Sequence, residues 1–228
     1  MARPTLKKQI QNLQQAIKDA AWNHIAKEGA PALSLRAIAR DLTITAPAIY
    51  NYFPDRDALV TALIIDAYTS FGDSQLAARD EIPPDDLIGR MNAIGLAYRQ
   101  WAHKYPQRYE LIFGTPIPGY QAPIEVMPSA ARSLNALVAV VEQVRLAEKL
   151  QIKFFPKVKA EFKVGFEMWK KYLGDVDILS LSVAMIIWAR VHGIVSLEIT
   201  DKLPLFGAKG DDLYLHELNS ITQQFIQE

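Results

Sequence analysis

The sequence predicts an all-α protein in which a small N-terminal helical domain precedes a larger helical one. Apolar residues recur at intervals of three and four along most of the 228-residue chain. Proline and glycine stand between these periodic segments, where they end helices. No stretch alternates between apolar and polar residues for long enough to indicate a strand. We place the domain boundary after residue 60, which makes residues 1–60 one domain and residues 61–228 the other.

The N-terminal domain begins with a predicted helix over Leu6–Glu28, whose apolar residues form one face. Gly29 can cap the C-terminus of this helix, and Pro31 prevents it from continuing. Ser34 can then cap a short helix over Leu35–Asp41, because its hydroxyl can accept from a free backbone N–H.

A second short helix is predicted over Ala46–Tyr52, with Thr45 as its cap. Pro47 lies in the first turn, where its missing N–H costs nothing. Asp55 can open a long helix from Arg56 to about Ala78, because acidic residues stabilise a helix N-terminus.

Residues 35–52 therefore contain two short helices joined by the turn 42–44, with a longer helix on each side. This is helix-turn-helix geometry, in which the second short helix is free to enter the major groove of DNA. The residues expected to form the core of this domain are Ile38, Leu42, Ile49 and Phe53.

Further helices are predicted over residues 85–104, 105–113, 129–150, 156–173, 176–199 and 211–227. The segment 114–128 holds four prolines and two glycines and is expected to be a loop. The most apolar stretch, 178–199, contains Arg190, His192 and Glu198, which are costly in a lipid bilayer. It therefore indicates a buried helix of a soluble protein.

Charge is unevenly distributed, although the formal net charge is zero. Residues 1–57 contain eight Lys and Arg against five acidic residues, a formal excess of +3. Contact with nucleic-acid phosphates is therefore expected in this part of the chain. The absence of cysteine excludes disulfides and thiolate metal sites and fits a reducing compartment. The polar N-terminus indicates no secretory signal, so a cytoplasmic location is expected.

An ordered set of residues within 14–62 resembles the N-terminal domain of the TetR/AcrR family of bacterial regulators. The set comprises Ile17–Ala21, Glu28–Gly29, Leu35–Ala39, Ala48–Phe53 and Arg56–Leu59. The family usually has glycine where this chain has Thr43, and frequently histidine where it has Tyr52. Because a β-branched residue disfavours positive φ, the turn is expected to be strained or differently shaped.

The resemblance implies that the second short helix and its surroundings contact DNA. The implied set is Ser34, Arg36, Thr45, Ala46, Pro47, Ala48, Tyr50, Asn51, Tyr52 and Arg56. Within it, Asn51 could bond bidentately with adenine, and the alanine methyl groups could touch thymine methyls. Tyr50 and Tyr52 match positions that usually contact phosphate, and Arg36 could reach a guanine or a phosphate. Arg56 could hold a phosphate together with the helix N-terminus.

These assignments have plain alternatives. The arginines could be ordinary solvated charges, Tyr52 could be a packing residue, and Asn51 could be surface without a role.

A second resemblance concerns the C-terminal domain. Residues 188–198 resemble the Trp/His-Gly signature of one C-terminal domain type of the same family, and residues 98–113 resemble an earlier part of it. Gly193 inside an apolar helix costs about 1 kcal/mol relative to alanine, which indicates a close helix approach. A dimer seam and a core within one chain both remain open.

The last predicted helix carries an apolar stripe beside polar residues. Its members are Tyr214, Leu218, Ile221 and Phe225. Two such helices from each subunit could form a four-helix dimer bundle, with a core within one chain as the alternative.

Aromatic residues supply material for an apolar effector pocket in the C-terminal domain. The candidates, with one histidine, are Tyr98, Trp101, Tyr109, Phe113, Phe166, Trp169, Trp188 and His192. Each could instead belong to an ordinary core, and His192 could satisfy a buried hydrogen bond.

Together these features predict a transcriptional regulator, a homodimer on a near-palindromic site in double-stranded DNA. A small-molecule effector of unknown identity would release it, with repression as the family default and activation as the alternative. The four histidines lack metal-ligand spacing, and no phosphate-binding glycine loop or nucleophile elbow is present. No enzyme activity, cofactor, metal or membrane partner is therefore expected. The alternative is a helical small-molecule-binding protein or enzyme whose N-terminal domain no longer reads DNA.

Overall fold

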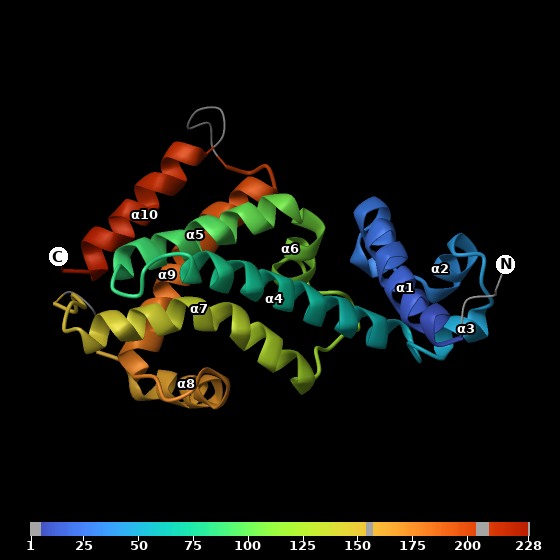
Figure 1. Cartoon of the computed structure of the whole chain (residues 1–228), viewed down its shortest axis with the longest axis horizontal. Coiled ribbons are helices and arrows are strands. Elements are labelled where there is room, and N and C mark those ends of the chain that lie inside the picture. Colours follow the sequence, from blue (N-terminus) through green and yellow to red (C-terminus); the bar gives the residue numbers. More distant parts are fainter. Residues whose placement is uncertain (1–5, 154–156, 204–209, 228) are drawn as a thin grey trace. The chain divides into compact units, whose positions relative to one another are not determined.

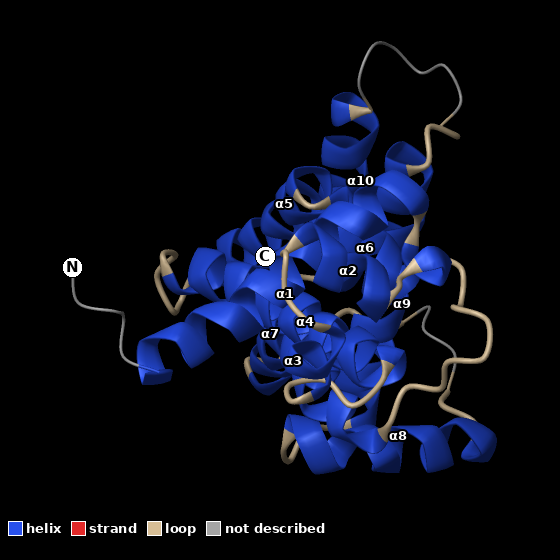
Figure 2. Ribbon diagram, turned by 90° about the vertical axis from the view of Figure 1, so that its right-hand side faces the viewer, coloured by secondary structure: helices blue, strands red, loops and turns tan. Residues whose placement is uncertain are grey.

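The computed structural model describes residues 6–153, 157–203 and 210–227, except for the side chains of residues 6–12 and 160–162. The described part of the chain is largely helical (Figures 1 and 2). It contains no β-strand beyond one isolated bridge between Leu150 and Ile226, which confirms the predicted all-α class. The helices are α1 (Leu6–Glu28), η1 (Ala30–Ala32), α2 (Leu35–Asp41), α3 (Ala46–Tyr50), α4 (Arg56–Asp80), α5 (Leu87–Lys104), α6 (Pro106–Phe113), η2 (Ile124–Val126), α7 (Met127–Leu146), α8 (Ala160–Leu173), α9 (Ile178–Ile199) and α10 (Asp211–Phe225).

The chain divides into two compact units. The first unit comprises Met1–Ala67 and Gln107–Val126, and the second comprises Tyr68–Pro106 and Met127–Glu228. The division falls inside α4, and nearly all of α6 belongs to the first unit. The domain boundary expected after residue 60 stays a prediction.

Two of the three N-terminal helix caps predicted in the first unit are confirmed. The Ser34 hydroxyl accepts from the backbone N–H of Ala37, and the Asp55 carboxylate accepts from that of Ala58 at 2.7 Å. Thr45 occupies the capping position of α3, but its side chain makes no capping bond. The first turn of α3 contains Pro47, which has no N–H to be capped.

The second short helix ends earlier than predicted, at Tyr50 instead of Tyr52. Pro54 restricts the residue before it to extended conformations, so a regular helix cannot continue through Phe53. The backbone N–H groups of Tyr52 and Phe53 both bond to the carbonyl of Ile49, which closes the helix tightly.

Of the predicted core residues, Leu42 is only half-buried, because it follows the last residue of α2, whereas the other three are buried.

The turn between α2 and α3 keeps the left-handed conformation that glycine favours. Thr43 has a φ of +54°. For a residue with a Cβ atom this region costs about 1–2 kcal/mol, and a β-branched side chain fits it poorly. The turn is therefore strained rather than reshaped.

Replacing Thr43 with glycine should raise the free energy of unfolding by about 0.5–1 kcal/mol. Glycine relieves the left-handed strain, and its greater freedom in the unfolded chain offsets part of that gain. Urea denaturation measures the change. Thr45→Gly is the matched control, because Thr45 has an ordinary extended conformation, and it should give no gain. An equal gain at both positions would show that strain at Thr43 is not the cause.

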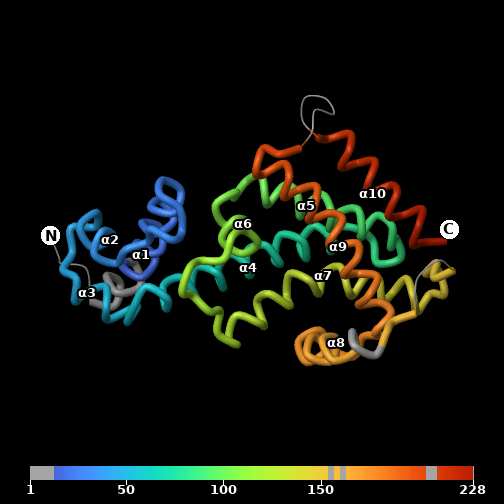
Figure 3. Tube along the Cα trace, turned by 180° about the vertical axis from the view of Figure 1, so that it is seen from behind, coloured from blue at the N-terminus to red at the C-terminus, as the bar shows by residue number. Residues whose placement is uncertain are grey.

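The second unit is built around α9. This helix contacts α5, α7, α8 and α10, and it lies between α10 on one side and α8 on the other (Figures 1 and 3). Two helical stretches, 124–146 and 178–199, are long and apolar enough to cross a membrane, but 44% of the apolar 18-residue window in each is buried inside the protein. The stretch 178–199 is α9. Its contacts with four other helices agree with the prediction that it is a core helix of a soluble protein.

Several helix ends in the second unit differ from prediction because local caps override the apolar period. Asp86 and Asp177 cap α5 and α9 through their carboxylates, so each helix starts two residues later than expected. The helix predicted to reach residue 150 ends at Leu146. Just after it, Glu148 adopts a φ of +59°, and the backbone N–H of Lys149 bonds back to the carbonyl of Val144, which closes the helix.

The other differences concern α8 and α10. The predicted start of α8, residue 156, lies outside the described residues, and the helix begins at Ala160. The last helix ends at Phe225 because Ile226 is extended and pairs with Leu150.

Candidate functional site

The outward surface of α3 combines a buried anchor with exposed side chains of mixed chemistry. Ile49 is fully buried and fixes the helix against the first unit. Tyr50 is 44% exposed, and Pro47 and Asn51 are also exposed. An exposed aromatic side chain next to an exposed amide gains little by packing inside the chain, so both groups are available to a partner.

The remaining predicted DNA contacts lie on or near α3 and differ in how exposed their side chains are. Ala46, Ala48 and Tyr52 are half-buried, and Thr45 is exposed. On α2, Arg36 is exposed, whereas the Ser34 hydroxyl is engaged in capping.

Arg56 is not a free cation. Its guanidinium donates to the carboxylate of the neighbouring Asp57 at 2.9 Å. A phosphate at this position would have to compete with that carboxylate or share the guanidinium with it.

The first unit also holds the segment that follows α5. The hydroxyl groups of Thr61 and Tyr120 lie 2.9 Å apart, and the guanidinium of Arg108 stands 5.2 Å from the ring centre of Trp22. These contacts join α1, α4 and the segment 107–126, so the support of the reading helices includes residues distant in sequence.

A narrow apolar cavity lies inside the second unit, among α4, α5, α7, α9 and α10. Its volume is about 30 Å³, which is room for a water molecule or two. Its walls are Gln75, Met91, Asn92, Ile94, Gly95, Tyr98, Ser133, Leu134, Leu137, Ile187, Trp188, Val191, Leu218 and Ile221. No charged side chain is among them, so the lining suits an uncharged and mostly apolar group.

Three of the predicted ligand residues meet at this cavity. Tyr98 and Trp188 line it, and the Tyr98 hydroxyl lies 3.0 Å from Nδ1 of His192. The His192 ring stacks on Trp188, with 4.9 Å between ring centres. Burial lowers the pKa of His192, so its neutral form, which can accept from the tyrosine hydroxyl, is favoured.

The stability of the protein should therefore fall as the medium becomes acidic. The unfolded chain protonates this histidine near pH 6.5, before the folded chain does. The free energy of unfolding thus decreases as pH falls from about 6.5 through the lower pKa of the folded state. His192→Gln keeps an acceptor for Tyr98 but cannot titrate. Denaturation curves across this pH range should be flatter for the variant, and equal slopes would contradict the assignment.

The other predicted ligand residues do not line this cavity. Trp101 is buried, and its indole N–H donates to the hydroxyl of Ser70 at 3.0 Å. Tyr109 belongs to the first unit, as does Phe113, and their rings are in contact. On α8, Phe166 and Trp169 are half-buried. Whether any of these residues meets a ligand stays a prediction.

Sequence reasoning missed most of the cavity walls because they are ordinary aliphatic residues. One signal was present, since Met91, Gly95 and Tyr98 follow helical spacing on α5 and all three line the cavity. A glycine in that series leaves room beside Leu218, whose side chain approaches the position that a Cβ atom would take.

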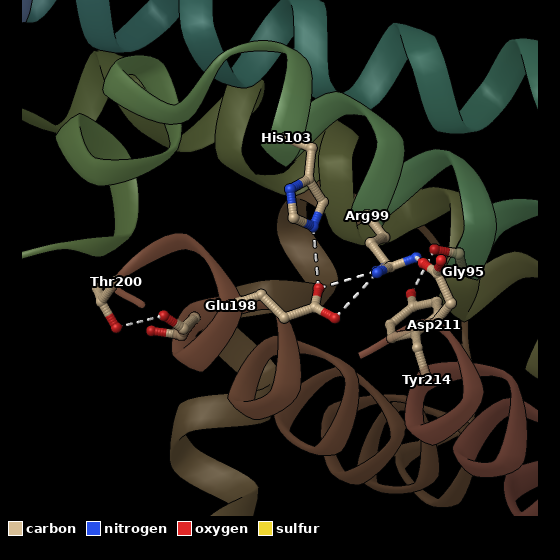
Figure 4. A network of polar contacts seen from close by, with 8 residues as sticks. Gly95, Arg99, His103, Glu198, Thr200, Asp211 and Tyr214 are labelled. Carbon is tan, nitrogen blue, oxygen red and sulfur yellow. Dashed lines mark hydrogen bonds and ion pairs between the residues drawn. The ribbon is translucent and has the colours of Figure 1, made fainter. Parts of the chain in front are cut away.

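A polar network joins α5, α9 and α10 beside this cavity (Figure 4). Arg99 donates to both oxygens of Glu198, at 2.8 and 3.0 Å, and to Asp211 at 2.6 Å. His103 also lies 3.0 Å from the Glu198 carboxylate, whose side chain is only 4% exposed. The bonds to Glu198 raise the pKa of Arg99. The network therefore connects the start of α10 to the helices that form the cavity.

The apolar stripe of α10 faces its own chain. Tyr214, Leu218, Ile221 and Phe225 are all buried, and the Tyr214 hydroxyl donates to the carbonyl of Gly95. Of the two possibilities that the sequence left open for this stripe, the structure therefore supports the core within one chain. The helix packs on α5 and α9 of the same subunit, because the apolar surface of these helices is available within the chain.

Gly193 shows the opposite behaviour. A Cβ atom built at this position would meet no atom within 4 Å. Packing inside the chain therefore does not account for a glycine in the middle of α9.

In the residues that the structure describes, no group of three His, Asp or Glu side chains could hold a metal ion.

Both parts of the chain match known families. Residues 17–63 match the family described as bacterial regulatory proteins of the tetR family, and residues 91–221 match the tetracyclin repressor-like C-terminal domain.

Relatives and solved structures extend this similarity over nearly the whole chain. The HTH-type transcriptional regulators Mb1846 of Mycobacterium bovis and Rv1816 of Mycobacterium tuberculosis are 32% identical over 214 residues, which covers 89% of this chain and 85% of theirs. The crystal structure of the regulatory protein SCO4313 has a TM-score of 0.77 at 32% identity, with 98% of this chain and 100% of that one covered.

Proposed function

Because the chain belongs to the TetR family of bacterial regulatory proteins, we propose that it is a repressor that a small-molecule effector releases from a near-palindromic operator. It is a transcriptional regulator with a helix-turn-helix DNA-binding domain, and the proteins of this family are not enzymes. The exposed pair Tyr50 and Asn51 on a buried anchor is the observation that carries the DNA-reading assignment. Such a protein would act in the cytoplasm, where bacterial DNA lies.

In the proposed complex α3 enters the major groove. Asn51 reads an adenine edge with its amide, and the methyl groups of Ala46 and Ala48 contact thymine. The hydroxyl groups of Tyr50 and Tyr52 donate to phosphates and set the register. Arg36 and Arg56 add charged contacts at the edges, with Ser34, Thr45 and Pro47 lining the approach.

The proposed dimer forms through the outer face of α9. Ile186, Gly193 and Leu197 lie on one side of this helix, with exposed Ala189 between them. The open space over Gly193 would let a second helix approach closely. Arg190 bonds to Glu217, Ser220 and Gln224 of α10 and holds that helix beside the seam. Each subunit contributes one pair of helices, α9 and α10. Two such helix pairs related by a two-fold axis match the symmetry of a palindromic site.

The proposed effector enters the cavity of the second unit, which widens to admit it. Since its walls carry no charge, an uncharged and mostly apolar molecule fits them best. The ligand favours a DNA-free state only to the extent that it binds that state more tightly. The cavity touches both Gly95 and Leu218, so filling it would act directly on the packing between α5 and α10.

A cavity-filling substitution should separate ligand binding from DNA binding. Val191→Phe places a ring in the space that the effector needs, at a stability cost of about 1–3 kcal/mol. The affinity for the uncharged apolar dye Nile red should fall at least about tenfold, while DNA affinity is unchanged. Fluorescence titration measures both, with Val191→Ala as the control that leaves the cavity open. Equal dye affinity in all three proteins would place the dye elsewhere.

Selection of binding sites from a random duplex pool tests the proposal as a whole. Enrichment of a two-fold-symmetric sequence is expected, with binding that weakens steeply as salt rises because phosphate contacts release counterions. A folded dimer that enriches nothing would instead support a helical binding protein whose N-terminal domain no longer reads DNA.

A further inference from the structure

The most basic stretch of the chain lies outside the DNA-reading unit. Residues 145–171 contain eight Lys and Arg against three Glu, a formal excess of +5 in a protein with zero net charge. This exceeds the +3 of residues 1–57. The proposed function uses none of these side chains, so the charge needs an explanation of its own.

The same stretch also exposes apolar side chains. Four of the ten large apolar side chains that are exposed in the described residues lie here, namely Leu146, Ile152, Val164 and Met168. Val164 is 78% exposed and Met168 is 48% exposed. Leaving such groups in water costs free energy, which burial against a partner would recover.

The helix α8 presents both kinds of side chain on one face. Val164, Met168 and Lys171 follow helical spacing and are all exposed. Lys163 flanks them, and the neighbouring Glu167 pairs with Lys170. On the inner side, only Leu173 is buried among the described side chains 163–173. The helix contacts α7 and α9 (Figure 1) and leaves its outer face uncovered.

We propose that this outer face of α8 binds the surface of an anionic lipid bilayer. A helix that lies in a membrane interface places apolar side chains among the acyl chains and lysines against the headgroups. Clusters of four to eight basic residues around such a helix are typical of contact with acidic lipids. This proposal departs from the sequence-based expectation of no membrane partner. The charged residues of α9 argue against a membrane span, whereas this contact lies on the bilayer surface.

The composition of the face favours lipid over the other two partners. Lysine is depleted in protein interfaces, which argues against a second copy of the chain as the occupant. Nucleic-acid phosphates would satisfy the lysines but leave Val164 and Met168 in water. A bilayer of acidic lipids satisfies both kinds of group.

Vesicle co-sedimentation of the full chain tests the proposal at 0.1 M salt. The protein should bind phosphatidylglycerol vesicles at least about tenfold more tightly than phosphatidylcholine vesicles, because each lysine near an acidic surface contributes about fivefold. The double variant Lys163→Gln/Lys171→Gln should lose about 25-fold in affinity for phosphatidylglycerol. Val164→Ser/Met168→Ser should lose about tenfold through the missing apolar contact.

Matched controls come from exposed side chains elsewhere. Lys104→Gln/Lys202→Gln removes two exposed lysines, and Ile124→Ser removes an exposed apolar residue, and neither change should alter vesicle binding. Equal binding to both lipids, or binding that survives both α8 variants, overturns the proposal. Absent vesicle binding, with a dimer weakened by Val164→Ser/Met168→Ser in sedimentation equilibrium, would instead assign this face to a second copy. Duplex binding weakened by the lysine variant without any vesicle binding would assign it to DNA.

Discussion

Replacing Gly193 with arginine should dissociate the dimer while each chain remains folded. In the single chain a Cβ atom at this position meets nothing within 4 Å, so a side chain can begin there without disturbing the core. Arginine also has a higher helix propensity than glycine, by about 0.8 kcal/mol. Across the proposed seam, however, a long charged side chain would separate the two α9 helices. We expect the dimer dissociation constant to rise at least about 100-fold, as measured by sedimentation equilibrium.

Gly165 provides the control for this experiment. It also lies in a helix and also has open space where a Cβ atom would stand, but it belongs to α8. Gly165→Arg should leave the dimer constant unchanged. A graded series at Gly193 from alanine through leucine to arginine should weaken the dimer progressively, and circular dichroism checks the fold of each variant. A dimer that tolerates Gly193→Arg would show that its seam lies elsewhere.

Replacing Tyr50 and Asn51 together with alanine should lower operator affinity at least about 100-fold. The amide is proposed to read a base, which contributes about 1–3 kcal/mol of discrimination, and the hydroxyl is proposed to position a phosphate. Both side chains are exposed, so the fold should survive their removal. Fluorescence anisotropy with the selected operator measures the loss.

Single variants separate the two roles. Asn51→Ala should relax the sequence preference at one base pair, whereas Tyr50→Phe should weaken binding to all sequences equally without changing the salt dependence, because the hydroxyl is neutral. Arg36→Gln should reduce the salt slope by about one if this arginine neutralises a phosphate. Asn23→Ala, at an exposed position on α1, is the control and should bind as the unchanged protein does. Unaltered binding in Tyr50→Ala/Asn51→Ala would remove α3 from the interface.

The local elements of the first unit could be read from the sequence because their signals act over a few residues. Ser34 and Asp55 cap the helices that follow them, and proline marks the interruptions. The errors were also local. The helix α3 ended before Pro54, and Thr45 occupied a capping position without making the bond, since a helix end depends on backbone geometry that residue type restricts only partly.

The apolar stripe of α10 and Gly193 of α9 illustrate what a sequence pattern cannot predict. The stripe Tyr214–Phe225 has the spacing of a packed face, and that spacing is the same whether the partner is the same chain or another. Only the fold shows that α5 and α9 already cover it. Gly193 posed the same question, and the fold shows that its own chain leaves the space around it open.

The helical class, the order of the helices and the family could be predicted without a structure, because periodicity, caps and motif spacing are properties of neighbouring residues. The tertiary structure alone decided which apolar faces are already covered, which side chains enclose the cavity, and that Arg99 meets Glu198 across 99 positions of the chain. Those outcomes depend on contacts between segments that are distant in sequence, and each amphipathic helix can satisfy its apolar face with more than one partner.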